Sequence, residues 1–292
     1  IEKMYPIPKD ANFNELLKIS DELLKCYNSF MPLTDLYEKE INSKIEARFI
    51  FHSVAIDGNI IPKDNLNKIL KEDSVIEGYK LSSHIEILNQ KDAINFIRAY
   101  AKKDGEFDES FLLNLHYIIL KTINTEYAGI YRKEIDTIGG SSYAPSDPKD
   151  IPQEIEKLIE YYNKCIKNHI HPEIIASEIH ERLCFIKPFE DANGMLARLV
   201  MNFIFLKFKY PLVNISSSIE GRLDYFEALE ASKTDMETFY RFIVKRTIKN
   251  LSYAIQELAT ILPMNKSVYF YKLIGEKLGE DKKKELISRI TF

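Results

Sequence analysis

The chain has 292 residues, of which 45% are hydrophobic and 29% are charged, and it contains only 10 Gly and 11 Pro. This balance is typical of a folded globular protein and excludes a mainly disordered chain. The formal net charge of −4 provides no basic field that would attract nucleic acid or an anionic membrane surface. Nucleic acid is therefore not an expected partner.

The cysteines and the apolar runs bear on the cellular compartment. Cys26, Cys165 and Cys184 are widely separated and show no CxxC spacing, so we expect buried, reduced thiols and no zinc site. No run approaches the ~20 apolar residues that a membrane span needs. The N-terminus shows no signal-peptide pattern. The sequence therefore predicts a cytoplasmic protein with no membrane partner.

Apolar residues at three- and four-residue spacing predict amphipathic helices along most of the chain. The pattern runs from Leu16 to Leu24, from Ile85 to Ile97, from Phe111 to Ile119 and from Ile155 to Tyr162, and it continues in the block from Pro172 to Phe208. Alternating segments rich in β-branched residues are scarce. The predicted fold class is therefore mainly α.

One segment interrupts the helical pattern. Residues 129–152 read GIYRKEIDTIGGSSYAPSDPKDIP, and the glycine pair, the prolines and the serine pair predict turns and a short β-hairpin. Such a hairpin in a helical domain is either a packing connector or a functional flap.

The stretch from Ile186 to Arg198 reads IKPFEDANGMLAR and carries the candidate chemistry. One helix must end near Pro188 and another begins after Gly194, so a tight turn of small residues separates them. The N–H groups of Ala192, Asn193 and Gly194 then converge at a helix N-terminus, which is a setting for a phosphate group. Asp191 supplies a carboxylate for a divalent metal. The alternative is an ordinary helix start in which Asp and Asn are capping residues.

This loop resembles the motif of the Fic (Fido) family, HPFx(D/E)GNGRxxR. Three positions differ: Lys187 stands at the family's histidine, Ala192 at its first glycine and Met195 at its first arginine. The alanine is a mild change, since the related Doc toxins have a similar turn. The resemblance implies a nucleotide site at Phe189, Asp191, Ala192, Asn193, Gly194, Met195 and Arg198, with Mg²⁺ and an ATP-like nucleotide as cofactors and Asp191 as the metal ligand.

Other segments resemble the family in the same order along the chain. Residues 129–145 are similar to the family's flap, and its turn residues here are Ile138, Gly139, Gly140 and Ser141. The flap interpretation is therefore preferred to the connector. Residues 224–229 and 239–243 resemble the helical wall of the adenine site, where the resemblance makes Tyr225 the stacking ring and where Lys233 replaces an occasional asparagine. The likeness covers roughly residues 45 to 245 and implies the mainly α Fic fold.

Residues 51–59, FHSVAIDGN, resemble the family's inhibitory helix, with Ser53 and Asp57 at the positions of the motif. An acid in the last turn of a helix faces the negative end of the helix dipole and so gains from a nearby cation. The resemblance makes Arg198 that cation. The alternative is that Gly58 only ends a helix and that Asp57 points into solvent.

The differences from the motif bear on catalysis. In the family, the histidine takes the proton from a target Ser, Thr or Tyr hydroxyl while AMP is transferred. A lysine with an ordinary pKa near ~10.4 is protonated at neutral pH and cannot accept that proton. A general base contributes roughly 10²–10⁴-fold, so we expect Lys187, the residue at the catalytic position, to leave transfer slow or absent. Met195 cannot neutralise phosphate charge, although the Lys187 ammonium could partly replace that charge.

The remaining histidines are weaker candidates. His180 lies on the helix that precedes the loop, and a packing role is preferred to catalysis; His52 and His116 are expected at the edge of the core. We expect an N-terminal helical region at residues 1–44, a Fic domain at 45–250 and a charged, helical C-terminal extension at 251–292.

Three readings of the function remain. The first is a Fic enzyme that modifies a protein hydroxyl with a nucleotide-derived group, the second is a non-catalytic nucleotide-binding regulatory module, and the third is a helical interaction protein without a ligand. The expected partners are a nucleotide and a protein target that the sequence does not identify. The family resemblance also leaves a homodimer open.

Overall fold

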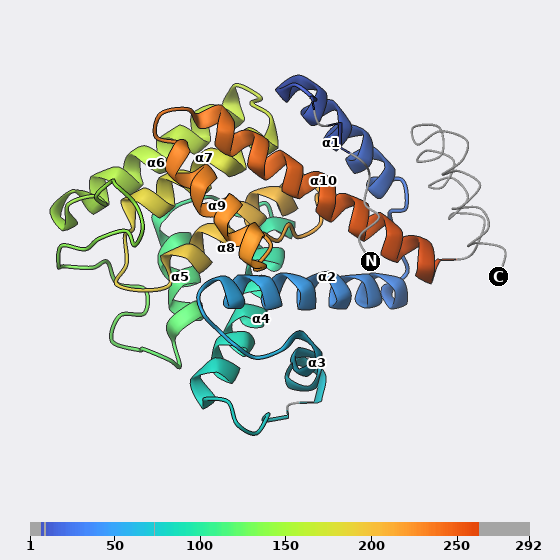
Figure 1. Cartoon of the computed structure of the whole chain (residues 1–292), viewed down its shortest axis with the longest axis horizontal. Coiled ribbons are helices and arrows are strands. Elements are labelled where there is room, and N and C mark those ends of the chain that lie inside the picture. The colour runs from blue at the N-terminus through green and yellow to red at the C-terminus, as the bar shows by residue number, and fades with distance from the viewer. Residues whose placement is uncertain (1–6, 9, 73, 263–292) are drawn as a thin grey trace. The chain divides into compact units, whose positions relative to one another are not determined.

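The computed structural model describes residues 7–8, 10–72 and 74–262, which form ten α-helices and one short 3-10 helix (Figure 1). The chain divides into two compact units, one made of Ile1–Ile45 with Val244–Phe292 and the other of Glu46–Ile243. The predicted domain limits at residues 44 and 250 stay predictions. From residue 263 onward, the predicted C-terminal extension lies outside the described residues.

The smaller unit contains α1, Phe13–Asn28, together with parts of two long helices, α2 at Asp35–Ile56 and α10 at Met236–Ile261. Helix α1 begins with a capping box, in which Asn12 and Glu15 bond to each other's backbone N–H groups at 3.0 and 2.7 Å. Within this unit Lys44 Nζ lies 2.8 Å from Glu257 Oε2.

The larger unit holds the candidate site. Its helices begin at recognisable signals: Asp108 caps α5, Ser218 caps α9, and Pro172 is the first residue of α7. The predicted helices of this unit are confirmed, and α8 begins at Asn193, one residue before Gly194. The bounds are α3 Lys63–Glu72, α4 Leu81–Lys102, α5 Glu109–Leu120, η1 Pro148–Asp150, α6 Ile151–Lys167, α7 Pro172–Ile186, α8 Asn193–Lys207 and α9 Ile219–Ala231.

The core of the larger unit is centred on α8. This helix packs against α7, α4 and α5, and most of its residues are buried, including Leu196, Leu199 and Phe203. Phe203 also joins an aromatic cluster with Phe111 of α5, at a ring distance of 4.5 Å. Each buried ring contributes roughly 1.5–3 kcal/mol. The two ends of α8 are therefore held firmly, which matters because its N-terminus forms part of the site.

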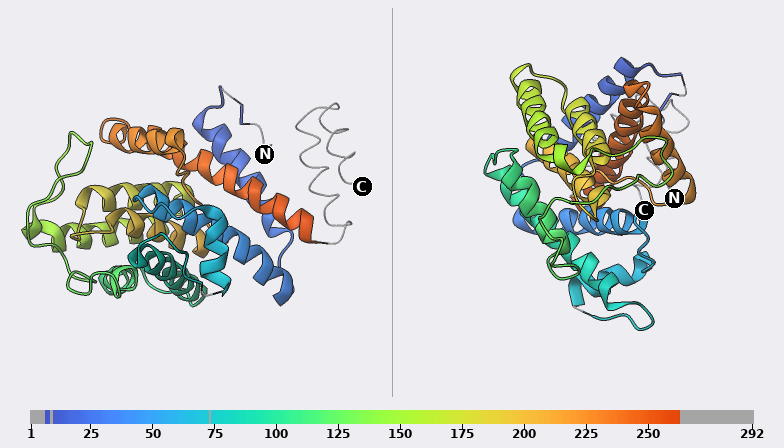
Figure 2. Two further views of the ribbon diagram at one scale, coloured as in Figure 1. Left: turned by 60° about the horizontal axis from the view of Figure 1, so that its bottom comes forward. Right: turned by 90° about the vertical axis from the view of Figure 1, so that its left-hand side faces the viewer.

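Residues 129–147, called the flap below, form an extended loop (Figure 2). The predicted hairpin is not formed: no strand occurs among the described residues, and one isolated bridge joins Tyr131 to Phe189. A turn does occur, with Gly140 at φ 77° and the Ser141 N–H donating to the Ile138 carbonyl at 3.1 Å. Beyond this turn, no backbone–backbone hydrogen bond joins the two arms within the described residues; the Arg132 side chain connects them instead, so no strand pair results. The mainly α class is confirmed.

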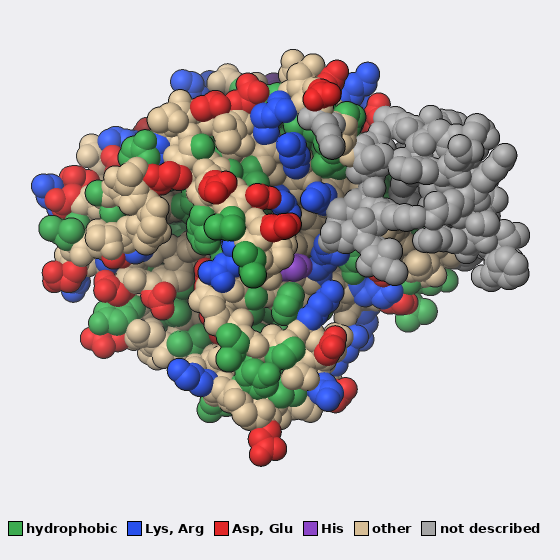
Figure 3. All heavy atoms as spheres, in the orientation of Figure 1, with side chains coloured by type: hydrophobic (Ala, Val, Ile, Leu, Met, Phe, Trp, Pro, Cys, Tyr) green, Lys and Arg blue, Asp and Glu red, His purple; other side chains and the backbone are tan. Residues whose placement is uncertain are grey.

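The surface mixes acidic, basic and apolar side chains on the face shown in Figure 3. All three cysteines are free; Cys26 and Cys165 are buried and Cys184 is half-buried. No helix within the described ranges combines the length and the apolar character that crossing a membrane requires.

Candidate active site

The loop between α7 and α8 is held in a fixed shape by side-chain bonds to its own backbone. The side chain of Asn193 accepts the Phe189 N–H at 3.0 Å and donates to the Phe189 carbonyl at 2.8 Å. At the two ends of the loop, Lys187 and Ala192 take left-handed conformations, with φ of 46° and 59°. This conformation costs a residue with a Cβ roughly 1–2 kcal/mol. The surrounding contacts therefore impose the shape of the loop.

His116 of α5 packs against this loop. Its ring stacks on that of Phe189 with 3.7 Å between the centroids. Nδ1 accepts the Gly129 N–H at 2.9 Å, so Nε2 carries the proton and donates to the Asp191 carbonyl at 3.0 Å. Burial lowers the pKa of His116 to about 4, so the ring is neutral at pH 7. His116 is fully buried and holds the loop in place, whereas the sequence predicted it at the edge of the core.

A pocket of about 420 Å³ lies at the N-terminus of α8. The first intrahelical bond of α8 is donated by the Leu196 N–H, and Ala192 offers no side-chain cap. The N–H groups of the first three helical residues therefore have no acceptor within the helix, and they carry its partial positive charge. This arrangement suits an anionic ligand. The pocket is lined by Asp57, Glu86, Ile119, Leu120, Ile123, Lys187, Glu190, Asp191, Ala192, Asn193, Gly194 and Met195.

The charged side chains of this pocket are mainly acidic. Among its described lining residues, Asp57, Glu86, Glu190 and Asp191 carry carboxylates and Lys187 carries the one ammonium group. Burial, with smaller contributions from Asp57 and Asp191, raises the pKa of Glu86 to about 7, although a 2.5 Å hydrogen bond from Asn59 opposes the shift. A polyphosphate would therefore need a cation to offset the acidic lining.

Arg198 reaches from α8 to the end of α2. Its guanidinium donates from Nε to Ser53 Oγ and from Nη2 to the Ser53 carbonyl, both at 3.0 Å. Nη2 also lies 2.5 Å from Asp57 Oδ2, and the Arg198 side chain is only 2% exposed. Gly58, at φ 103°, ends α2 here. Asp57 therefore points to Arg198 and not only into solvent, as the resemblance implies.

Lys187 faces the flap. Its Nζ lies 2.5 Å from Asp136 Oδ2 and donates to the Thr137 carbonyl at 2.6 Å. Burial acts to raise the pKa of Asp136, but the hydrogen bonds from Lys187 and the Thr137 N–H lower it below its ordinary value. The ammonium is thus held by two acceptors of the flap.

This geometry agrees with what sequence comparison finds. Residues 106–205 match the sequence profile of the Fic/DOC family. The chain contains a Fic domain. Protein adenylyltransferase Fic of Drosophila willistoni is 30% identical over 227 residues, which are 76% of this chain and 45% of that protein. The relative of the same name in Drosophila grimshawi is 30% identical over 228 residues, 76% of this chain and 46% of that protein. The chain spans about half the length of these curated relatives.

Solved structures share the fold. A Fic domain containing signaling protein from Bacteroides thetaiotaomicron superposes with a TM-score of 0.76 at 23% identity, over 83% of this chain and 97% of that one. Fic-1 from C. elegans gives a TM-score of 0.74 at 22% identity, over 84% of this chain and 73% of that one. The predicted Fic fold is therefore confirmed.

Not all residues that the motif implies lie at the pocket of the Fic domain. Phe189, Arg198 and Tyr225 are buried at 0 to 2% exposure and do not line it. Tyr225 is enclosed by Phe242 and bonded to His180 Nε2 at 2.8 Å, so its ring forms part of the interior. The flap residues Ile138, Gly139, Gly140 and Ser141 lie at the turn described above and do not line this pocket either.

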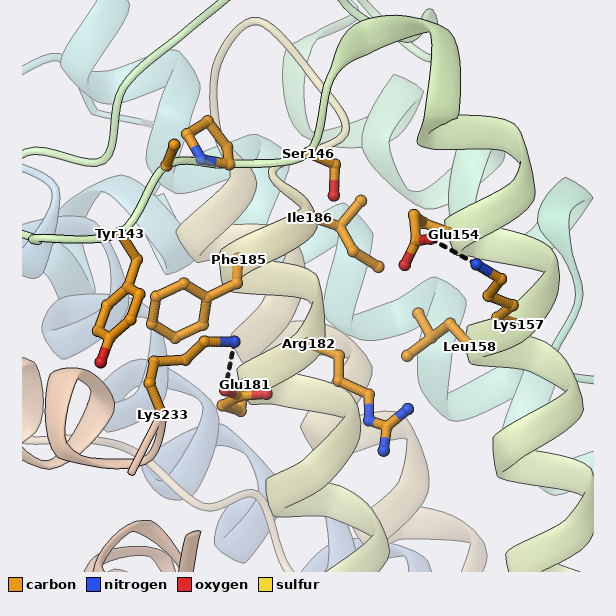
Figure 4. Close-up of a pocket in the computed structure, with 12 residues that line it drawn as sticks. Tyr143, Ser146, Glu154, Lys157, Leu158, Glu181, Arg182, Phe185, Ile186 and Lys233 are labelled. Atoms are coloured by element: carbon orange, nitrogen blue, oxygen red, sulfur yellow. Dashed lines mark hydrogen bonds and ion pairs between the residues drawn. The ribbon is translucent and has the colours of Figure 1, made fainter. Parts of the chain in front are cut away.

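A second pocket of about 330 Å³ lies between the end of the flap, α6 and α7 (Figure 4). Lys233 places its Nζ 4.1 Å from the centre of the Phe185 ring and 3.4 Å from Glu181 Oε1. Lys157 is paired with Glu154 at 2.8 Å. Arg182, the third cation labelled in Figure 4, lies 3.1 Å from Glu178 Oε2, so each of these three cations already has an acidic neighbour.

Sequence reasoning missed several residues of the site. Glu86 carries no local signal, because its position on α4 looks like any solvent-facing glutamate. Asp136 of the flap, which pairs with Lys187, and Glu230, which binds the flap, also lack a signal. Arg132 lies in the flap segment that the sequence singles out. Its position beside a predicted turn is a signal from which an anchoring role for this side chain could have been inferred.

Proposed function

We propose that the chain binds an ATP-like nucleotide with Mg²⁺ in the 420 Å³ pocket, and that it transfers AMP or a related group to a protein hydroxyl slowly. The observation that carries the proposal is the uncapped N-terminus of α8, which meets the pocket beside the Arg198–Asp57 pair. The name of the relatives, protein adenylyltransferase, supports the class of reaction. The proposal also includes a protein target and a homodimer. The chain specifies neither the target nor the dimer.

The residues at the pocket fit a nucleotide that brings its own metal. Asp191 is exposed, and its Oδ1 accepts the Ala192 N–H at 2.7 Å, which orients the carboxylate at the pocket. The described part of the chain contains no group of three or more His, Cys, Asp or Glu side chains that could hold a metal ion. Mg²⁺ commonly binds through one or two carboxylates, substrate phosphates and water. A metal on Asp191 would offset phosphate charge against the acidic lining.

Transfer requires a base that this chain does not place at the motif position. When a target hydroxyl oxygen bonds to the α-phosphorus and pyrophosphate leaves, the hydroxyl proton needs an acceptor. The Lys187 ammonium donates to the Asp136 carboxylate and the Thr137 carbonyl, so it is not placed to take the proton. Buried Met195 supplies no charge for the phosphates. The same contact favours the second candidate function, nucleotide binding without turnover in a regulatory module.

Asp57 is proposed to restrain nucleotide binding. Its carboxylate occupies Arg198 and adds negative charge at the wall of the pocket. Asp57→Ala should therefore tighten ATP–Mg²⁺ binding by about three- to tenfold, because repulsion is removed and Arg198 becomes available. Calorimetric titration measures this change. Asp64→Ala, which removes an exposed acid of α3, is the control and should bind as the parent does. Equal affinity in Asp57→Ala would remove the restraint from the proposal.

Two assays separate the candidate functions. ATP–Mg²⁺ at about 100-fold above its Kd should stabilise the fold by ~2.7 kcal/mol and so raise the melting temperature by several degrees. Transfer of label from α-labelled ATP to the chain or to lysate proteins then distinguishes an enzyme from a binding module. A melting temperature that ATP–Mg²⁺ leaves unchanged would favour a ligand-free interaction protein and would contradict the proposal.

A further inference from the structure

Charged side chains hold the flap at its base, its middle and its tip. Its base is held by Arg132, its middle by Lys187 and its tip by Glu230. Between the last two lie Gly139 and Gly140, where an added Cβ would meet no atom within 4 Å. The flap is therefore fixed by a few polar contacts, because packing does not confine its turn.

Arg132 anchors the base through backbone carbonyls on both sides. Nη1 donates to the Glu134 carbonyl at 2.8 Å and Nη2 donates to the Ser146 carbonyl, so one side chain joins the two arms of the flap. Nε donates to the Lys187 carbonyl at 2.6 Å. The guanidinium is buried, with Arg132 only 4% exposed. This anchor ties the arms to the end of α7 but leaves the turn free.

The middle of the flap is held by Lys187. Its ammonium bonds both the Asp136 carboxylate and the Thr137 carbonyl, and the side chains of Lys187 and Asp136 are 23% and 30% exposed. Two simultaneous acceptors from neighbouring residues fix both the position and the direction of the chain there. The contact needs a long cationic side chain at position 187, which an imidazole does not provide.

The tip is held by Glu230 of α9. Its Oε2 accepts the Ser141 hydroxyl at 2.6 Å, and its Oε1 accepts the Ser142 N–H at 2.9 Å and the Ser142 hydroxyl at 2.5 Å. These hydrogen bonds lower the pKa of Glu230 below its ordinary value. The carboxylate thus stays an acceptor at neutral pH and holds the turn through three hydrogen bonds.

We propose that Lys187 is a positioning residue which, together with Glu230, latches the flap in one conformation against the active-site loop and α9. Lys187 can hold the flap through its charge and its N–H donors, whereas it cannot act as the base in group transfer. That the latched flap contributes to binding a protein substrate rests on the proposed function. The latch itself is a contact within the chain, so it can be tested without nucleotide or target.

Hydrogen exchange of the flap amides, measured by mass spectrometry on the whole chain without nucleotide, tests the latch. The N–H groups of Thr137, Ser141, Ser142 and Tyr143 are hydrogen-bonded, so flap opening is visible in their exchange. Lys187→Met and Asp136→Asn should each speed exchange in residues 134–142 by about three- to tenfold. Their double variant should be no faster than the faster single variant.

Conservative and control variants complete the test. Lys187→Arg keeps the charge and the donors and should exchange within about twofold of the parent. Glu230→Ala should speed exchange at residues 141–143. Lys121→Met breaks a comparable ion pair between the residue that ends α5 and Asp92 of α4, Lys121–Asp92 at 2.9 Å, and should leave the flap unchanged.

Flap exchange within about twofold of the parent in both Lys187→Met and Asp136→Asn, with α7 and α8 still protected, would overturn the latch. If Lys187→Met does not fold, Asp136→Asn tests the same contact from a half-buried loop position. Because these rates need no ligand, their failure is distinct from failure of the proposed nucleotide binding, which the ATP–Mg²⁺ melting shift of the parent reports.

Discussion

At the scale of single residues, the role of Lys187 depends on the side chains around it as well as on its residue type. A lysine at the position of a family base could in principle be activated by burial beside other cations. In this fold its neighbour is the Asp136 carboxylate at 2.5 Å, and it shares the pocket with Asp191. The residue therefore suits a charged contact and not proton abstraction.

Replacing this lysine tests the argument directly. Lys187→His should raise the rate of AMP transfer by at least about tenfold, because a neutral imidazole can accept the hydroxyl proton and a positioned base contributes roughly 10²–10⁴-fold. Label transfer from ATP to lysate proteins is the measurement. Lys187→Gln, which removes the charge without adding a base, is the control. An increase in both variants would attribute the gain to lost charge and contradict the base argument.

At the scale of elements, the loop between α7 and α8 is preformed. Asn193 closes it on Phe189, and His116 of the neighbouring helix supports both the ring of Phe189 and the carbonyl of Asp191. A preorganised turn keeps the first N–H groups of α8 directed at the pocket without further ordering on binding. The residues that give the loop its shape are thus distinct from those that would touch a ligand.

The contribution of Asn193 is measurable. Asn193→Ala removes two buried hydrogen bonds and leaves the Phe189 N–H and carbonyl unpaired, so it should destabilise the fold by about 2–4 kcal/mol. We also expect at least about tenfold weaker nucleotide binding. Urea unfolding and calorimetry measure the two effects. Asn114→Ala, on the exposed face of α5 where Asn114 bonds only Ser110 at 3.3 Å, is the control and should stay near the parent. Unaltered stability in Asn193→Ala would contradict the closed-loop account.

At the scale of the whole molecule, two buried histidines link stability to pH. Burial lowers the pKa of His116 from 6.5 to about 4 and that of His180 from 6.5 to about 3. The unfolded chain then binds more protons than the folded chain once the pH falls below about 6.5. The stability that the neutral rings contribute is complete above that pH and is lost as the pH falls toward 4 and 3. Glu86, with a pKa raised to about 7, acts in the opposite direction.

Acid should therefore weaken the fold. Between pH 6.5 and 4.5 each histidine loses roughly 2–3 kcal/mol of its contribution, at ~1.4 kcal/mol per pH unit. His180→Gln should be less stable than the parent at pH 6.5 but should lose roughly 2 kcal/mol less between the two pH values. Urea denaturation at both pH values measures the difference. Parallel losses in the parent and in His180→Gln would show that this ring does not control the acid response.

The sequence predicts features that depend on neighbours along the chain. Helices α4 to α8 of the larger unit are read from apolar spacing, and the turn before α8 is read from its small residues, because both patterns are local. The hairpin is the exception. Gly139 and Gly140 predict a turn correctly, but strand pairing depends on which partners the two arms find, and those arms bond to Lys187 and Glu230.

By itself, the sequence determined the mainly α class, the turn of small residues before α8 and the motif positions that differ. The family resemblance anticipated the pairing of Arg198 with Asp57, 141 residues apart. Only the tertiary structure decided the other polar contacts of the site, such as His116 with the Asp191 carbonyl, 75 residues apart, and Lys187 with the Thr137 carbonyl, 50 apart. Helix periodicity acts over a few residues, whereas an ion pair needs two side chains brought within about 4 Å by packing, and no local pattern specifies that meeting.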